Sequence, residues 1–259
     1  MSPRNFQFTC AVGGILGLVL ALVAFIVSGF LPPISPLLDA EQTARHYRNH
    51  EKGIQAGAAL IVVSGMFYIL LTVAISAQMQ CIPNLHYAVS ALQLALGTAG
   101  GFAFLLPGLM LAVANYRLDR PVEITQTLND MFWITFLLPW PTFMAQSFTI
   151  AYAIIIDSRP KPLFPKPTAI LNIVAPFIYV LAAAVHCVKT GPMAWNGAVA
   201  FWIPLVAFGC QVVIDSICLI RALSAEPGTG GKNLDAFPTS PENCPDNCAA
   251  RSDHNNCQG

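Results

Sequence analysis

Residues 131–156 read MFWITFLLPWPTFMAQSFTIAYAIII, a stretch without a single charged side chain. About 20 apolar residues suffice for a helix to cross a bilayer, so this stretch is long enough to be a transmembrane span. Pro139 and Pro141 interrupt it, and because neither has a backbone amide, the carbonyls of Thr135 and Leu137 lose their helical partners. Hydrocarbon offers no replacement donor. We therefore expect a non-lipid cavity beside this break.

The composition indicates an integral membrane protein. Of the 259 residues, 55% are hydrophobic and only 10% are charged, whereas soluble domains carry about 25% charged residues. So little charge does not cover a water-exposed surface of this size. The net charge is zero, so no basic field favours nucleic acid as a partner. The expected surroundings are a lipid bilayer.

Six apolar stretches predict an all-α fold, a polytopic transmembrane helical bundle within residues 1–223. The predicted spans are 6–31, 53–79, 87–115, 131–156, 168–188 and 194–220. The first is longer than the core of a signal peptide, which has about 7–15 residues, so we expect it to be retained. Residues 224–259 are polar and lack periodicity, which predicts a disordered tail.

A short helix is predicted between the first two spans. Asp39 is placed to cap it, and Gln42 occupies the third helical position of a capping box. Residues 40–52 then form a helix that either lies at the membrane surface or is solvated. We expect Gly53 to turn the chain into the second span.

Small residues recur at helical spacing in the first and third spans. Gly13 and Gly17, and again Gly97 and Gly101, have the four-residue spacing that allows helices to approach closely. This pattern serves packing within one chain, or it joins the chain to a second copy or another subunit through the glycine faces. The sequence leaves both readings open.

The distribution of basic residues favours cytoplasmic termini. With six spans both ends lie on one side, which holds seven of the 13 lysines and arginines. Cytoplasmic loops are enriched in these residues. We therefore predict a multi-pass protein of the inner (plasma) membrane with both termini in the cytoplasm.

Asp215 is the carboxylate placed well inside an apolar run, VVIDSICLI. An intramembrane acid is by default a functional candidate, here for proton or cation coupling. The alternative is a structural acid that reaches the interface near Arg221. Gln211, one turn earlier, is expected to hydrogen-bond it.

The four tryptophans concentrate in the fourth and sixth spans, and Trp140 and Trp202 each lie beside a proline. Aromatic side chains at such positions either line an apolar ligand pocket or serve ordinary helix packing. We predict a cavity between the fourth, fifth and sixth spans, and its candidate residues are Trp140, Gln146, Asn172, Trp195, Asn196, Trp202 and Asp215.

Two groups of metal-ligand residue types give only weak signals. Cys244, Cys248, His254 and Cys257 form C-x3-C-x5-H-x2-C, whose donors suit zinc, but the spacing matches no known finger. His46 and His50 share one helix face, as metal-binding pairs do, but neighbouring basic residues oppose a cation. We therefore predict no metal and no cofactor.

Several motifs resemble an uncharacterised family of bacterial, mainly actinobacterial, multi-span membrane proteins. The resemblance covers about residues 6–222. It rests on Leu31-Pro32-Pro33-x-Ser35-Pro36, Tyr47-Arg48, Gly53-Ile54-x-x-Gly57, Ala77-Gln78-Met79, Arg159-Pro160-x-Pro162-x-Phe164-Pro165 and Lys189-Thr190-Gly191-Pro192-x-Ala194-Trp195-Asn196-Gly197-x-x-Ala200-Phe201-Trp202-x-Pro204. It implies a compact helical bundle and assigns no catalytic residue. Gln80-Cys81-Ile82 departs from the family, which tends to have basic residues there.

The sequence contains no Ser-His-Asp pattern, phosphate loop or metalloprotease motif. The favoured function is accessory, or the binding or transport of a small hydrophobic molecule, without a catalytic centre. One alternative is a membrane-bound lipid-modifying or redox enzyme that uses His46 and His50. Another is a structural subunit of a membrane complex.

Overall fold

The computed structural model describes residues 3–160 and 162–225. Within these ranges the chain is all-helical and contains no strand. The predicted tail beyond Ala225, with Cys244, Cys248, His254 and Cys257, lies outside the described residues. The α-helices are α1 (Pro3–Val27), α2 (Ala40–Asn49), α3 (Glu51–Met79), α4 (Tyr87–Tyr116), α5 (Val122–Leu137), α6 (Trp140–Ile156), α7 (Thr168–Ala182) and α8 (Ile203–Ala225).

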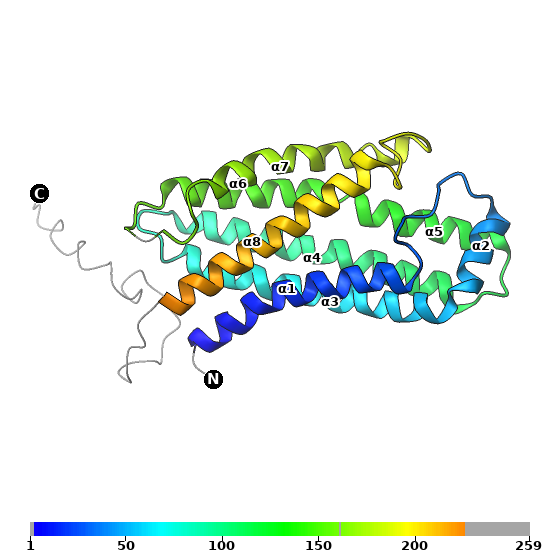
Figure 1. Cartoon of the computed structure of the whole chain (residues 1–259), viewed down its shortest axis with the longest axis horizontal. Coiled ribbons are helices and arrows are strands. Elements are labelled where there is room, and N and C mark those ends of the chain that lie inside the picture. The colour runs from blue at the N-terminus through cyan, green and yellow to red at the C-terminus, as the bar shows by residue number, and fades with distance from the viewer. Residues whose placement is uncertain (1–2, 161, 226–259) are drawn as a thin grey trace, which may run out of the picture.

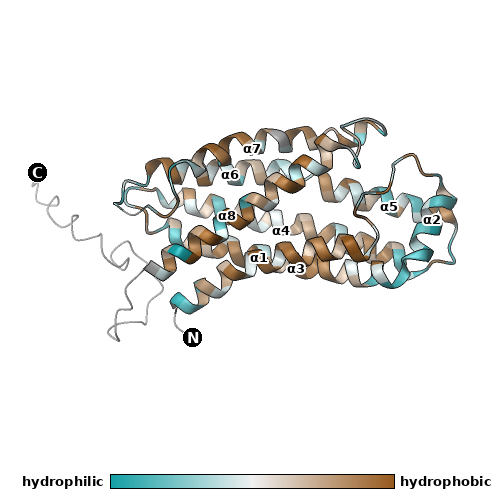
Figure 2. Cartoon of the chain, in the orientation of Figure 1, coloured by the Kyte–Doolittle hydropathy of each residue, from teal (hydrophilic) through white to brown (hydrophobic). Residues whose placement is uncertain are grey.

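The long helices lie side by side, and α8 runs obliquely across them (Figure 1). Apolar residues follow the lengths of the helices, and hydrophilic residues gather at the two ends of the bundle, including α2 (Figure 2). In the described part of the chain, five helical segments are long and apolar enough to cross a membrane: Arg4–Val27, Glu51–Met79, Tyr87–Tyr116, Thr168–Cys187 and Ala198–Ser224. These segments are compatible with a multi-pass membrane protein.

The predicted fourth span, 131–156, is not one helix. It is divided between α5, which begins at Val122, and α6, which begins at Trp140. Pro139 and Pro141 cannot donate to the last turn of α5, whereas a proline is accommodated in the first turn of α6, where no amide donor is required. The two helices follow one another along the bundle (Figure 1).

The first span ends earlier than predicted because of a C-terminal cap. Gly29 has φ +67°, a left-handed conformation that glycine adopts without strain. Its amide donates to the carbonyl of Ile26, and the amide of Phe30 donates to that of Phe25. This pair of bonds is a Schellman motif, which closes α1 at Val27.

The predicted capping box is confirmed. The amide of Gln42 donates to Oδ1 of Asp39, and the amide of Asp39 donates to Oε1 of Gln42. Ala44 and Tyr47 on the inner face of α2 are buried, and the Tyr47 hydroxyl donates to Asn129 of α5 at 3.3 Å. The apolar face of α2 therefore packs on its own chain.

The turn after α2 was misplaced. It falls at His50, and Gly53 already lies inside α3. A Cβ on Gly53 would collide with the Val27 carbonyl oxygen, so glycine is needed here for the close approach of α1 and α3.

Residues after α7 also differ from the prediction. A short 3-10 helix at Val185–Cys187 and a π-helical turn at Ala198–Trp202 precede α8, so the predicted fifth and sixth spans are not regular α-helices over their whole length. Pro204 has no amide for the carbonyl four residues earlier, which accounts for the irregular turn in front of α8. The sixth predicted span thus begins as a regular helix at Ile203 instead of Ala194.

The predicted glycine faces are turned towards helices of the same chain. A Cβ on Gly17 would lie 2.9 Å from Cβ of Phe67 in α3, and one on Gly101 would lie 2.5 Å from Cγ1 of Ile69. These contacts are close enough that larger side chains would separate the helices. The glycines therefore bring α1, α3 and α4 together.

We predict that Gly53→Ala lowers the free energy of unfolding by about 2 kcal/mol, because the new methyl group must displace the α1 backbone. Gly209→Ala in α8 is the matched control, since its Cβ would meet nothing closer than Leu18 at 3.8 Å. Alanine there is expected to leave stability unchanged or raise it by up to about 1 kcal/mol. Thermal unfolding of both purified variants in detergent measures the difference, and equal losses would contradict the close approach at Gly53.

Candidate functional site

Two adjoining hollows lie inside the bundle. The larger, which we call the aromatic cavity, is lined mainly by apolar side chains of α1, α3, α4, α5, α6 and α8, including Phe104, Phe136, Trp140, Leu205 and Phe208. The smaller, which we call the polar pocket, includes Thr72, Gln146, Ser147, Gln211 and Asp215 in its lining. Tyr68, Phe143, Phe208 and Val212 line both, so the two spaces meet at these side chains.

The aromatic cavity begins at the break between α5 and α6. Trp140, the first residue of α6, is 5% exposed, and its ring lies 5.4 Å from that of Phe208 and 5.2 Å from that of Tyr179. Phe136, near the end of α5, meets Trp140 edge to face at 6.5 Å. The proline break thus brings two aromatic rings from successive helices to one wall of the cavity.

Gln211 of α8 is the centre of a buried hydrogen-bond network. Its Nε2 donates to Oγ of Ser147 and to Oδ1 of Asn172, each at 2.8 Å, and its Oε1 accepts from the Tyr179 hydroxyl at 3.2 Å. Asn172 in turn donates to the carbonyl of Thr168 at 3.0 Å. The network joins α6, α7 and α8 and satisfies the amide groups of Gln211 inside an apolar bundle.

Gln146 belongs to a second contact at the same level. The Tyr68 hydroxyl of α3 donates to its Oε1 at 2.6 Å. Gly97 of α4 leaves room for this amide, since a Cβ at that position would lie 2.7 Å from Nε2 of Gln146. One of the glycines that packs α4 against its neighbours therefore also shapes the polar pocket.

Asp215 differs from the other polar side chains of the pocket because it lacks a partner. It is 4% exposed, and its Oδ1 has no hydrogen bond within the described structure. The sequence predicted a bond from Gln211, but the donors of Gln211 are occupied by Ser147 and Asn172. An unpartnered carboxylate in a low-dielectric interior is costly.

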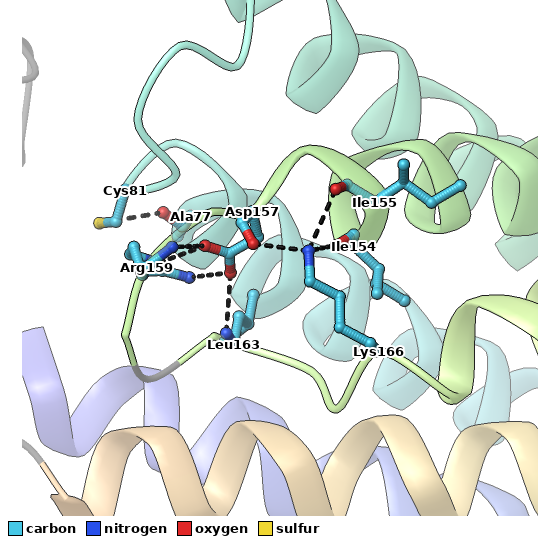
Figure 3. A network of polar contacts seen from close by, with 8 residues as sticks. All are labelled: Ala77, Cys81, Ile154, Ile155, Asp157, Arg159, Leu163 and Lys166. Carbon is cyan, nitrogen blue, oxygen red and sulfur yellow. Dashed lines mark hydrogen bonds and ion pairs between the residues drawn. The ribbon is translucent and has the colours of Figure 1, made fainter.

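A second buried aspartate, Asp157, differs from Asp215 because both of its carboxylate oxygens accept hydrogen bonds (Figure 3). It follows α6, is 1% exposed, and accepts two bonds from the Arg159 guanidinium at 2.8 and 2.7 Å and one from the Leu163 amide at 2.9 Å. Burial raises the pKa of this carboxyl, but the bonds from Arg159 and Leu163 outweigh burial and leave the pKa below its ordinary value. This aspartate holds the loop after α6 in place.

Lys166 completes that loop. Its Nζ donates to the carbonyls of Ile154, Ile155 and Asp157 at 2.7, 3.0 and 2.6 Å, which satisfies carbonyls left without partners at the end of α6. Because the bonds of Asp157 and Lys166 join the end of α6 to the loop that follows it, we interpret the cluster as structural.

The structure brings four of the seven predicted cavity residues together. Trp140 lines the aromatic cavity, Gln146 and Asp215 line the polar pocket, and Asn172 contacts it through Gln211. The α7 span was expected to form one wall of the cavity. Its residues Asn172 and Tyr179 instead bond to Gln211, which lines the polar pocket.

The other three predicted residues line neither of the two hollows. Trp195 stacks on Trp133 with ring centroids 6.1 Å apart and donates to the carbonyl of Ile34 at 2.8 Å, so it fastens the loop before α2. Asn196 lies in the connection before α8, and Trp202 is 38% exposed. Sequence reasoning missed Tyr68 and the central role of Gln211, although an amide four residues before Asp215 in an apolar run was a usable signal.

His46 and His50 stack face to face, with ring centroids 4.3 Å apart. Nε2 of His46 lies 3.2 Å from the Ser28 carbonyl oxygen, and Nδ1 of His50 lies 3.1 Å from that of His46. Burial, together with the neighbouring His50, lowers the pKa of His46. Across residues 3–160 and 162–225, no three histidine, cysteine or acidic side chains gather as a metal site requires.

Comparison of the chain with protein-family models, with curated proteins and with solved structures finds no match. The resemblance to the actinobacterial membrane family therefore stays a prediction.

We predict opposite effects of one substitution at the two buried aspartates. Asp157→Asn is expected to lower the free energy of unfolding by about 3 kcal/mol, because it leaves the largely buried Arg159 without its counter-charge. Asp215→Asn is expected to leave stability unchanged or increase it, because it replaces an unpartnered carboxyl group by a neutral amide of the same shape. Thermal unfolding of both variants tests this, and an equal loss at Asp215 would identify a structural role for its carboxylate.

Proposed function

We propose that this chain is a multi-pass membrane protein that binds a small, largely apolar molecule in the aromatic cavity. The observation that carries the proposal is a hollow lined by several aromatic rings and adjoined by the polar pocket. Ligand sites typically have apolar and aromatic walls with a few convergent polar groups.

The residues around this space favour binding or transport over catalysis. Their hydroxyl and amide groups are engaged with one another, as in Tyr68 with Gln146 and Gln211 with Ser147. Nucleophilic catalysis needs a nucleophile within reach of a general base. Among the lining residues, Asp215 has no serine, cysteine or histidine bonded to its Oδ1.

We further propose six membrane crossings, with α5 and α6 together forming the fourth. They follow one another along the bundle (Figure 1), and neither alone has the length of a span. A broken helix at membrane depth is tolerated where it lines a protein cavity, which is the position of Trp140. This topology supports a common side for both termini, and the basic residues favour the cytoplasmic face of the inner membrane for that side.

We predict that filling the aromatic cavity abolishes ligand binding. Leu205→Trp places a large ring where Leu205 lines the cavity, and Val206→Trp is the matched control because Val206 is 62% exposed on the outer face of the same helix. The probe is 4-phenyl-1-butanol, measured by calorimetry on protein in lipid nanodiscs after subtraction of empty discs. Loss of binding in Leu205→Trp alone is expected. Retained binding in Leu205→Trp, or no binding to the unsubstituted protein, would refute the cavity proposal.

We predict that the loops before α5 and after α6 lie on opposite sides of the membrane. Asp119→Cys and Ser158→Cys, each in a chain whose native cysteines are replaced by serine, provide exposed labelling sites in these loops. A membrane-impermeant maleimide is expected to label Asp119→Cys from outside intact cells and Ser158→Cys only after the membrane is opened. Labelling of both from one side would exclude a crossing by α5 and α6.

A further inference from the structure

The hydroxyl groups that line the polar pocket donate their protons to groups other than Asp215. The Tyr68 hydroxyl donates to Gln146, that of Thr72 to the Ile69 carbonyl, and that of Ser147 to the Phe143 carbonyl. None of these three protons is directed to Asp215. The pocket thus presents the carboxylate of Asp215 and the lone pairs of hydroxyl groups, beside the amide nitrogen of Gln146. A ligand group that binds the carboxylate must supply hydrogen-bond donors.

Asp215 also lacks a counter-charge from the protein. The ion pairs within the described residues join Arg48 to Glu41 and Arg159 to Asp157, and Arg221, the next basic residue along α8, is exposed. Buried charges in proteins are paired or coordinate a cation. A cationic group in the pocket would form an ion pair with the carboxylate of Asp215.

Aromatic rings surround the junction between the pocket and the cavity. The rings of Phe143 and Phe208 are 5.0 Å apart, and that of Tyr68 lies 5.5 Å from Phe143 and 5.7 Å from Phe208. The faces of such rings attract ammonium groups, and beyond them the aromatic cavity accepts an apolar body. A hard metal ion would instead require several oxygen ligands and would leave the aromatic cavity unused.

We propose that the ligand is a small lipophilic amine, whose protonated ammonium group sits at Asp215 and whose apolar body fills the aromatic cavity. This inference rests on the proposed function and adds the charge and polarity of the ligand. The ammonium group supplies up to three donors and no acceptor, which matches the unbonded Oδ1 of Asp215 and the hydroxyl lone pairs beside it. Its aliphatic or aromatic body is held by burial of apolar area.

The test compares three probes of one shape: 4-phenylbutylamine, 4-phenyl-1-butanol and 4-phenylbutyrate. Each is titrated by calorimetry at pH 7.5 into the full chain in nanodiscs of zwitterionic lipid, with empty discs subtracted. A charge-assisted hydrogen bond predicts that the amine binds about 10- to 100-fold more tightly than the alcohol, and that the acid binds most weakly.

Asp215→Asn is expected to remove the preference for the amine while leaving the alcohol within about twofold of the original affinity. The matched control is Ser216→Ala, which removes a buried and unpartnered hydroxyl from the neighbouring position and should keep the preference. If Asp215→Asn cannot be purified in folded form, the order of the affinities of the three probes for the unsubstituted chain tests the amine inference.

The outcomes separate the two proposals. Equal affinity for amine and alcohol would overturn the amine inference and leave the aromatic cavity as a binding site. An equal weakening of both probes by Asp215→Asn would show that the carboxylate acts on the structure and would also overturn the inference. Binding of none of the probes would overturn both proposals.

Discussion

The hydrogen-bond requirement of polar groups in an apolar interior organises this structure. Hydrocarbon cannot solvate an amide or a hydroxyl, so such groups are paired inside the protein. Gln211 shows the consequence, because its amide bonds Ser147, Asn172 and Tyr179 and thereby fixes α6, α7 and α8 relative to one another. Among the described residues a few buried polar atoms lack a bond, and Asp215 Oδ1 is the carboxylate oxygen among them. A group that the surrounding network does not satisfy is the natural place for a ligand.

Sequence patterns located most helices because hydropathy and capping chemistry are local. The capping box of Asp39 and Gln42 and the limits of α3 and α4 follow from residues close together in the chain. The end of α1 was missed, although Gly29 carried the local signal for a Schellman cap. The division of residues 131–156 was only partly visible, because prolines show where hydrogen bonds are lost but not whether a helix bends or restarts.

The candidate site was harder to predict, because hydropathy does not report the rotation of a helix about its axis. Trp140 and Trp202 both lie near prolines in apolar runs, yet one faces the interior and the other is 38% exposed. Trp195 is buried through a bond to Ile34, 161 residues away in the chain, and no local pattern encodes that contact. Asp215 could be predicted as a candidate from the sequence, because a carboxylate in an apolar run is unusual whichever direction it faces from the helix.

The aromatic cavity follows from two kinds of packing that meet in one bundle. Gly17 and Gly101 bring α1, α3 and α4 into close contact, and Gly17 also lines the cavity. The rings of Phe143 in α6 and Phe208 in α8 meet edge to face with centroids 5.0 Å apart. Large planar groups packed in this way do not fill the surrounding volume as completely as glycine contacts do. The break before Trp140 prevents α5 and α6 from closing the gap as one straight helix. A hollow at this junction is therefore a consequence of where the sequence places glycine, proline and aromatic residues, and the carboxylate of Asp215 lies at its polar end.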